Sequence, residues 1–261
     1  MWIAAIILIG VGGLLLYFRK RTQDRLLDIR FVKTSSIAET LEEQRAIAAE
    51  LGPGGYAQQK EFKGTVRCDE PLTGELSGQP CVYYTMSVEE RYEETYTERD
   101  SQGNTQTRTR TGSAVVASNT QHTRFLLDDG SCSIAVDFDG ASVDARKVVE
   151  RYEPYAGGGG SLRVGSFTLS LGMAAGPRRV LGYQYRESII PVGQALYALG
   201  EVNDSGGEAV LRRPGDKKAP FILSIKSEEE LTRDSERSIT FLLWGAVGCF
   251  VIGAVLLALS F

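Results

Sequence analysis

The sequence predicts a mainly β protein, flanked by an N-terminal helix and two transmembrane helices. Both ends of the chain are apolar, and every charged residue lies between positions 19 and 238. Within that region, short runs of alternating polarity recur between turn-forming residues, a pattern typical of antiparallel strands. We expect eight to twelve short strands in a barrel- or sandwich-like arrangement, with one long protruding hairpin.

The first apolar segment, residues 1–18, contains the uncharged run WIAAIILIGVGGLLLYF. At about 1.5 Å per helical residue, this run nearly matches the hydrocarbon core of a bilayer. A cleaved signal peptide would carry its positive charges first, whereas here RKR follows the apolar run. The segment therefore predicts a transmembrane helix that stays attached.

Residues 19–55 form a basic segment followed by a linking helix. Ser36 and Glu39 have the spacing of a capping box, and apolar residues then recur at helical intervals until Gly52 and Pro53. The helix either lies on lipid or on the β domain, or simply connects two parts of the chain. Its acidic polar face favours the connecting role, because interfacial helices are rich in lysine.

Residues 60–226 are predicted to form the β domain. In CVYYTMSV the side chains of Val82, Tyr84, Met86 and Val88 alternate with more polar ones, which is the period of a half-buried strand. Pro71 and Pro80 cannot donate hydrogen bonds to a sheet, so we place them in the turns before this strand.

The strand continues through RYEETYTERD and returns as TQTRTRTGSAVVAS. If Asp100–Thr105 form the loop, Glu94 lies opposite Arg110 and Tyr96 lies opposite Arg108, which gives complementary cross-strand pairs. We expect a polar hairpin that docks a partner through Tyr92, Glu94, Tyr96, Arg108 and Arg110. A solvated hairpin without a binding role is the alternative.

Two further motifs are interpreted as structural. Asp129 and Gly130 predict a type I′ turn, and the nearby aspartates lack the remaining ligands of a calcium loop. Gly157–Gly160 lacks the GK[ST] ending of a phosphate-binding loop. We expect no metal and no cofactor. The aspartates in question are Asp128, Asp129, Asp137 and Asp139.

Residues 227–261 are predicted to form one helix that enters a second membrane span near Ile239. Ser227 and Glu230 have capping-box spacing at its start. Basic residues flank both spans on the side of the β domain, and neither tail carries lysine or arginine. By the positive-inside rule, we place residues 19–238 in the cytoplasm.

The composition argues against several functions. A net charge of -4 without a long basic face argues against the usual nucleic-acid binder. His122 is the single histidine, it lies outside any recognisable nucleophile motif, and we predict no catalytic residue. Cys68 and Cys81 are expected to be thiols in the cytoplasm, whereas a periplasmic domain would allow a disulfide between them.

Four segments, in this order between two membrane helices, resemble the GIDE domain of membrane-embedded ubiquitin ligases: KGTVRCDEPLTGELSGQPCVYY, RFLLDDGSCSIAVDFDGASV, GQALYALGEV and FILSIKSEEEL. The resemblance implies binding of substrates or partners at a membrane. In eukaryotic relatives a RING domain with eight Cys or His ligands recruits the conjugating enzyme. The four cysteines and one histidine here cannot supply them, so we expect a RING-less, bacterial-type member.

The predicted function is therefore recognition of a protein partner or ligand at the membrane surface, without enzymatic activity of its own. One alternative is a component of a ubiquitin-ligase-like or proteolytic membrane complex. Another is a membrane-organising homo-oligomer, because Gly245, Gly248 and Gly253 would allow close helix approach. The expected partners are the lipid bilayer and a protein, with a second copy of the chain in the oligomer alternative, and no nucleic acid is expected.

Overall fold

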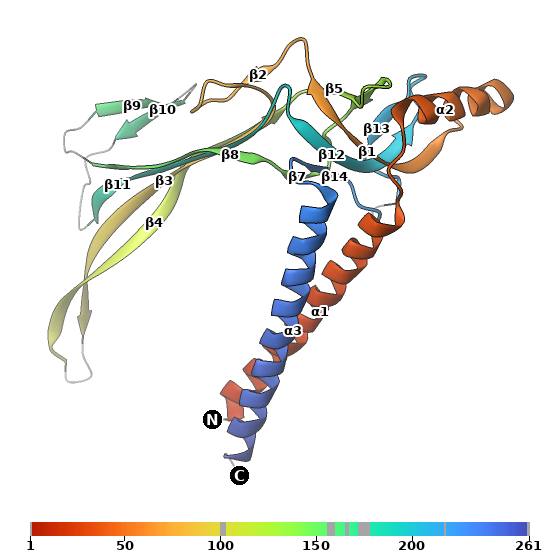
Figure 1. Cartoon of the computed structure of the whole chain (residues 1–261). Coiled ribbons are helices and arrows are strands. Elements are labelled where there is room, and N and C mark those ends of the chain that lie inside the picture. The colour runs from red at the N-terminus through yellow and green to blue at the C-terminus, as the bar shows by residue number, and fades with distance from the viewer. Residues whose placement is uncertain are drawn as a thin grey trace. The chain divides into compact units, whose positions relative to one another are not determined.

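The computed structural model describes residues 2–99, 103–155, 160–164, 167–171, 178–216 and 218–259 (Figure 1). Its helices are α1 (Trp2–Phe31), α2 (Ile37–Leu51) and α3 (Glu228–Ala258). The chain divides into two compact units, and the strands of residues 60–226 are shared between them. The mainly β prediction is confirmed, but the described residues form fourteen strands, more than the eight to twelve expected.

Unit 1 comprises residues 1–64, 127–144 and 195–261. Its sheet runs in the order β1-β5-β6-β13-β12-β14-β7, and β12 also pairs with β1. This extra pairing closes β1, β5, β6, β13 and β12 into a ring, which confirms the barrel-like expectation. The strands are β1 (Ala57–Arg67), β5 (Phe125–Asp128), β6 (Ser133–Val136), β7 (Ser142–Asp144), β12 (Ala195–Asn203), β13 (Val210–Arg212) and β14 (Ile222–Ser224).

A buried carboxylate lies where both long helices join this barrel. The Glu61 side chain is 0% exposed and accepts hydrogen bonds from Thr34, just after α1, and from Tyr197 in β12, at 2.6 and 2.9 Å. Burial and the Glu61 carboxylate raise the pKa of Tyr197 well above its usual range. Lys63 lies 3.7 Å from Glu61 and 2.8 Å from Glu228 in the first turn of α3. Glu61 therefore links α1, α3 and two barrel strands.

The linking helix α2 packs on the barrel. Glu43 of α2 accepts hydrogen bonds from Lys60, Gln58 and Tyr56, and the bond from Lys60 lowers the pKa of Glu43. Gln44 donates to Asp204 at 2.9 Å. Within unit 1, these contacts identify α2 as a helix held against β1.

The start of α2 differs from the predicted capping box. Ser36 is the N-cap residue, but its side chain makes no capping hydrogen bond. Instead, Asp129 accepts from the backbone N–H of Ile37 at 2.8 Å. The type I′ turn predicted at Asp129 and Gly130 is wrong, because Asp129 does not adopt the positive φ that this turn requires. Four residues join β5 to β6, and Asp129 accepts from Ser131 and Cys132 inside that loop.

Helices α1 and α3 lie side by side, and the first residues of α1 lie near the last residues of α3 (Figure 1). In residues 2–19 of α1, the less exposed residues are spaced three and four apart, as in a heptad: Ala5, Leu8, Gly12, Leu15 and Arg19. A Cβ added to Gly12 would lie 3.0 Å from Phe250, and one added to Gly253 would lie 3.2 Å from Ile9. The missing side chains therefore allow a close antiparallel approach.

Both helices extend beyond their apolar segments. Helix α1 continues through the basic residues to Phe31, and α3 is unbroken from Glu228. The predicted capping box of α3 is confirmed, since Ser227 and Glu230 bond reciprocally. Both helices are long and apolar enough to cross a membrane.

Unit 2 comprises residues 65–126 and 145–194. Its main sheet is antiparallel, with β3 between β11 on one side and β2 and β4 on the other, and β8 beyond β11. The strands are β2 (Leu72–Thr73), β3 (Pro80–Arg99), β4 (Thr105–His122), β8 (Arg146–Pro154) and β11 (Arg178–Pro191), besides a separate pair of β9 (Gly160–Val164) and β10 (Phe167–Leu171).

The core of unit 2 confirms the predicted alternation in β3. Tyr84, Met86 and Val88 are buried against Tyr185 and Ile189 of β11. The turn between β2 and β3 wraps around another buried carboxylate, Glu187. That group accepts the backbone N–H groups of Leu76 and Ser77 at 2.8 and 2.9 Å. Pro80 is the first residue of β3 and pairs with Thr73, so its predicted place in the turn is wrong. Gly74 and Gly78 lie in the turn that Glu187 holds in place.

Candidate functional site

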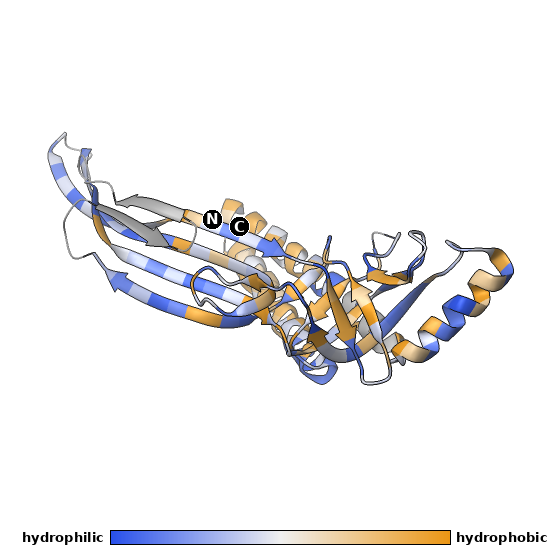
Figure 2. Ribbon diagram, turned by 90° about the horizontal axis from the view of Figure 1, so that it is seen from above, coloured by the Kyte–Doolittle hydropathy of each residue, from blue (hydrophilic) through white to orange (hydrophobic). Residues whose placement is uncertain are grey.

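The β3–β4 hairpin has the predicted register. Glu94 is the cross-strand partner of Arg110, and Tyr96 is that of Arg108. The strands end at Arg99 and begin at Thr105; of the expected loop, residues 100–102 lie outside the described part. Strand β11 begins opposite Glu94, so among the described pairings the last residues of β3 pair with β4 alone. Figure 2 shows this outer part in the blue and white of polar residues.

One face of the hairpin carries alternating acidic and aromatic residues, which we call the acid–aromatic face. Arg110 donates two hydrogen bonds to Glu94, at 3.0 and 2.8 Å, and lies 5.5 Å from the centre of the Tyr96 ring. The members from β3 are Glu90, Tyr92, Glu94, Tyr96 and Glu98, and the neighbouring strands add Arg108, Arg110 and Arg178.

The arginines of this face contact acidic and aromatic side chains at several positions along the hairpin. Arg108 pairs with Glu98 at 3.3 Å and not with the Tyr96 ring opposite it. Arg178 lies 3.6 Å from the centre of the Tyr92 ring and donates to Glu90 at 2.6 Å. Each guanidinium thus neutralises a carboxylate, and two of them also cover a ring.

The acid–aromatic face continues the apolar core of unit 2. Because side chains alternate along a strand, Glu90 follows Val88 on the same side of β3. The Tyr183 hydroxyl donates to Glu90 at 3.4 Å, and burial together with Glu90 raises the pKa of Tyr183 to about 12. The face is therefore anchored at its inner end and becomes more exposed toward Tyr96 and Glu98.

Irregular pairing on both sides of β3 opens a hollow at the base of the hairpin. The register shifts between Val88 and Glu89 in the pairing with β4, and the pairing with β11 shifts at Leu181. The hollow has a volume of about 390 Å³. A Cβ added to Gly112 would lie 2.7 Å from the Tyr92 ring, so Gly112 makes room for that side chain. Its lining residues are Glu89, Arg91, Tyr92, Thr111, Gly112, Ser113 and Leu181.

The charges at this hollow are partly compensated. Hydrogen bonds from Ser113 and Arg186 hold the pKa of Glu89 below its usual range. Arg91 lies 5.7 Å from the centre of the Tyr152 ring. The hollow therefore presents one neutralised carboxylate and one guanidinium.

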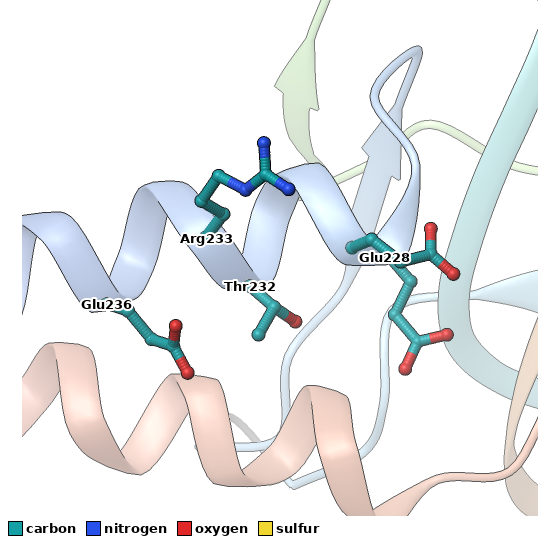
Figure 3. A pocket seen from close by; sticks show the side chains of 5 residues that line it. Glu228, Thr232, Arg233 and Glu236 are labelled. Carbon is teal, nitrogen blue, oxygen red and sulfur yellow. The ribbon is translucent and has the colours of Figure 1, made fainter.

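A second hollow, of about 340 Å³, lies along the first turns of α3 (Figure 3). Two of its carboxylates have partners: Lys63 binds Glu228, and the hydrogen bond from Ser227 lowers the pKa of Glu229. The lining residues are Glu228, Glu229, Thr232, Arg233 and Glu236. We therefore assign this hollow to the attachment of α3.

The histidine and cysteines considered for catalysis lie in environments typical of structural residues. His122 is exposed at the end of β4, opposite Tyr83. Burial and the nearby Glu187 raise the pKa of Cys81 to about 11, which keeps this thiol protonated and unreactive at neutral pH. The four cysteines are free, so Cys68 and Cys81 are not bridged. Across the described ranges, no three His, Cys, Asp or Glu side chains are grouped to hold a metal ion.

A comparison with protein families identifies the relationship. The family model GIDE, described as an E3 ubiquitin ligase, matches residues 93–258, which is more than half of the chain. The chain belongs to the GIDE family. This GIDE match begins inside β3 and includes the outer hairpin, the barrel strands from β5 onward and α3. Neither the curated proteins nor the solved structures gave a match.

The structure brings the five predicted residues onto one face, and it adds three that the sequence reasoning missed. Glu90, Glu98 and Arg178 complete the charge pairing of the acid–aromatic face. The period-two pattern of EERYEETYTER, residues 89–99, contains the first two. Arg178 belongs to a distant segment, so no local pattern indicates it.

Proposed function

We propose that this GIDE protein is a membrane-anchored recognition subunit of a ubiquitin-ligase-related system. In this proposal, α1 and α3 hold the chain in a bilayer, and the acid–aromatic face binds a protein partner. The family match over the hairpin and α3 is the observation that carries it. The proposal assigns the subunit no transfer chemistry of its own.

The side chains along α1 and α3 support the membrane assignment. A Cβ on Gly245 would lie 3.4 Å from Leu15, so the two helices have neighbouring residues at this level. Tyr17 and Trp244 are exposed there, and aromatic side chains are enriched at membrane interfaces. The basic residues Arg19, Lys20 and Arg21 follow at once, as expected where a helix leaves the hydrocarbon.

The composition of the acid–aromatic face supports protein binding. Tyrosine and arginine are the residues most often found at the energetic centres of protein interfaces. Here Tyr92, Tyr96 and Arg110 are held in place by neighbouring residues before any partner arrives, and such preorganisation lowers the entropic cost of association.

Copurification from detergent-solubilised membranes tests this function. We expect the full-length chain to retain a ubiquitin-pathway protein, and Tyr96→Ala and Arg110→Ala to reduce its recovery about tenfold, as loss of an interface hot spot does. Lys147→Ala is the matched control, because it removes an exposed ion pair with Glu150 on β8. Equal recovery with all three variants would refute the assignment of the face.

We further propose that residues 19–238 face the cytoplasm. A membrane-impermeant thiol reagent should then label the half-buried Cys68 and Cys132 only after the membrane has been permeabilised. Labelling in intact cells would show the opposite orientation.

A further inference from the structure

The opposite side of the same hairpin has a different composition. It carries a nearly uniform set of exposed threonines, with Thr95 opposite Thr109 and Thr97 opposite Thr107. Glu93 and Arg99 are the charged members from β3. We call this side the threonine face, and its members are Glu93, Thr95, Thr97, Arg99, Thr105, Thr107, Thr109 and Thr111.

The charges on the threonine face lack the pairing found on the acid–aromatic face. Apart from the backbone pairing of the strands, the side chains of Glu93 and Arg99 form no hydrogen bond or ion pair with any residue that the structure describes. Arg179 is the cross-strand partner of Glu93 in β11 but does not form an ion pair with it. A neutral, threonine-rich centre is thus bordered by one carboxylate and one guanidinium that have no side-chain partner among the described residues.

The positions of these charges make the face complementary to itself. Glu93 and Arg99 lie on one strand, three residues to either side of Tyr96. Two copies can pack with their threonine faces together, related by a two-fold axis that lies in the plane of contact. If this axis runs perpendicular to the strands at the level of Tyr96, each end of the face in one copy lies over the opposite end of the face in the other. Such an isologous contact places Glu93 against Arg99 twice, about 20 Å apart.

The same operation pairs the remaining residues without conflict. Thr95 meets Thr97 of the second copy, Thr107 meets Thr109, and Thr105 meets Thr111. Threonine methyl groups supply apolar contact and the hydroxyl groups can exchange hydrogen bonds. The alternative axis along the strands would instead place Glu93 against Thr111 and leave both charges unpaired.

We propose that the threonine face is the contact by which two copies of this chain associate. The contact is small, but anchoring both copies in one bilayer raises their effective concentration, so a weak interface suffices. This inference is independent of the partner bound by the acid–aromatic face, because it uses the other side of the hairpin.

Energy transfer between donor- and acceptor-labelled full-length chains in lipid vesicles tests the proposal. Glu93→Arg leaves the face with positive charges alone, and Arg99→Glu leaves it with negative charges alone. Each variant, mixed only with itself, is expected to associate about tenfold more weakly than the unaltered chain, because like charges meet in the contact.

The decisive sample mixes the two variants. A donor-labelled Glu93→Arg chain and an acceptor-labelled Arg99→Glu chain present opposite charges at both ends, so their energy transfer should return to the original level. Thr85→Ala, at the inner part of the hairpin, is the control and should leave self-association unchanged. Unchanged transfer in either single variant, or no recovery in the mixture, would overturn the proposal. Partner capture by the acid–aromatic face is measured separately and does not depend on this result.

Discussion

Glu61 in the barrel and Glu94 in the hairpin are both strand carboxylates that accept two hydrogen bonds, yet their surroundings differ. The Glu61 side chain is 0% exposed and joins segments far apart in sequence, whereas Glu94 is 29% exposed and bonds its cross-strand neighbour. Water can replace the partner of Glu94 but not those of Glu61. Similar contacts therefore maintain the fold in the barrel and shape a surface in the hairpin.

The largest effect on stability is predicted for the buried carboxylate of the barrel, Glu61. Glu61→Ala leaves the Thr34 and Tyr197 hydroxyls without their buried acceptor, and it should lower the free energy of unfolding by about 3–5 kcal/mol. Thermal unfolding in detergent measures it. Lys63→Ala is the control: its side chain is 42% exposed, so we expect a loss of about 1 kcal/mol or less. Equal losses in the two variants would contradict the claim that the buried carboxylate contributes more to stability than its exposed partner.

The turn around Glu187 predicts the next effect. Glu187→Ala deprives two backbone N–H groups of their acceptor, and we expect a loss of about 2–3 kcal/mol. Hydrogen exchange should report it locally, because the amides of Leu76 and Ser77 would lose their protection. In Glu187→Gln, which keeps an acceptor oxygen, part of the protection should remain. If both amides stay protected in the alanine variant, the carboxylate does not hold this turn.

A smaller effect is expected where the hairpin joins the sheet. Gly112→Ala places a methyl group against the Tyr92 ring and should cost about 1–3 kcal/mol. Tyr92→Ala in the same chain removes the clash, so the double variant should be more stable than the sum of the two single losses predicts. Additive losses would show that Tyr92 does not occupy the space beside Gly112.

The outer hairpin predicts the smallest effect on stability. The Arg110 side chain is 65% exposed, so Arg110→Ala should leave the free energy of unfolding nearly unchanged. Denaturant unfolding of the purified chain measures this. A loss close to that of Glu61→Ala would mean that the acid–aromatic face supports the fold rather than a partner.

The sequence predicted the elements whose signals are local. Alternation located the buried face of β3, the loop position fixed the register of Glu94 with Arg110, and the motif at Ser227 and Glu230 located the start of α3. These features depend on residues a few positions apart or on one short loop, so the pattern of side chains is sufficient to find them.

The features that depend on distant residues were missed or predicted incorrectly. Asp129 replaced Ser36 as the acceptor at the start of α2, although 92 positions separate it from Ile37. The partners of Glu61 and Glu187 likewise come from other segments. The alternation in β3 distinguished two faces, but only the pairing with β4 and β11 showed which charges are compensated.

Photocrosslinking from two adjacent hairpin positions tests the central claim most directly. A photoreactive amino acid replaces Tyr96 in one full-length chain and Thr97 in another, and both are irradiated in native membranes. The account predicts that position 96 forms an adduct with a ubiquitin-pathway protein, while position 97 joins two copies of the chain. Identical adducts from the two positions, or none with a protein from position 96, would contradict it.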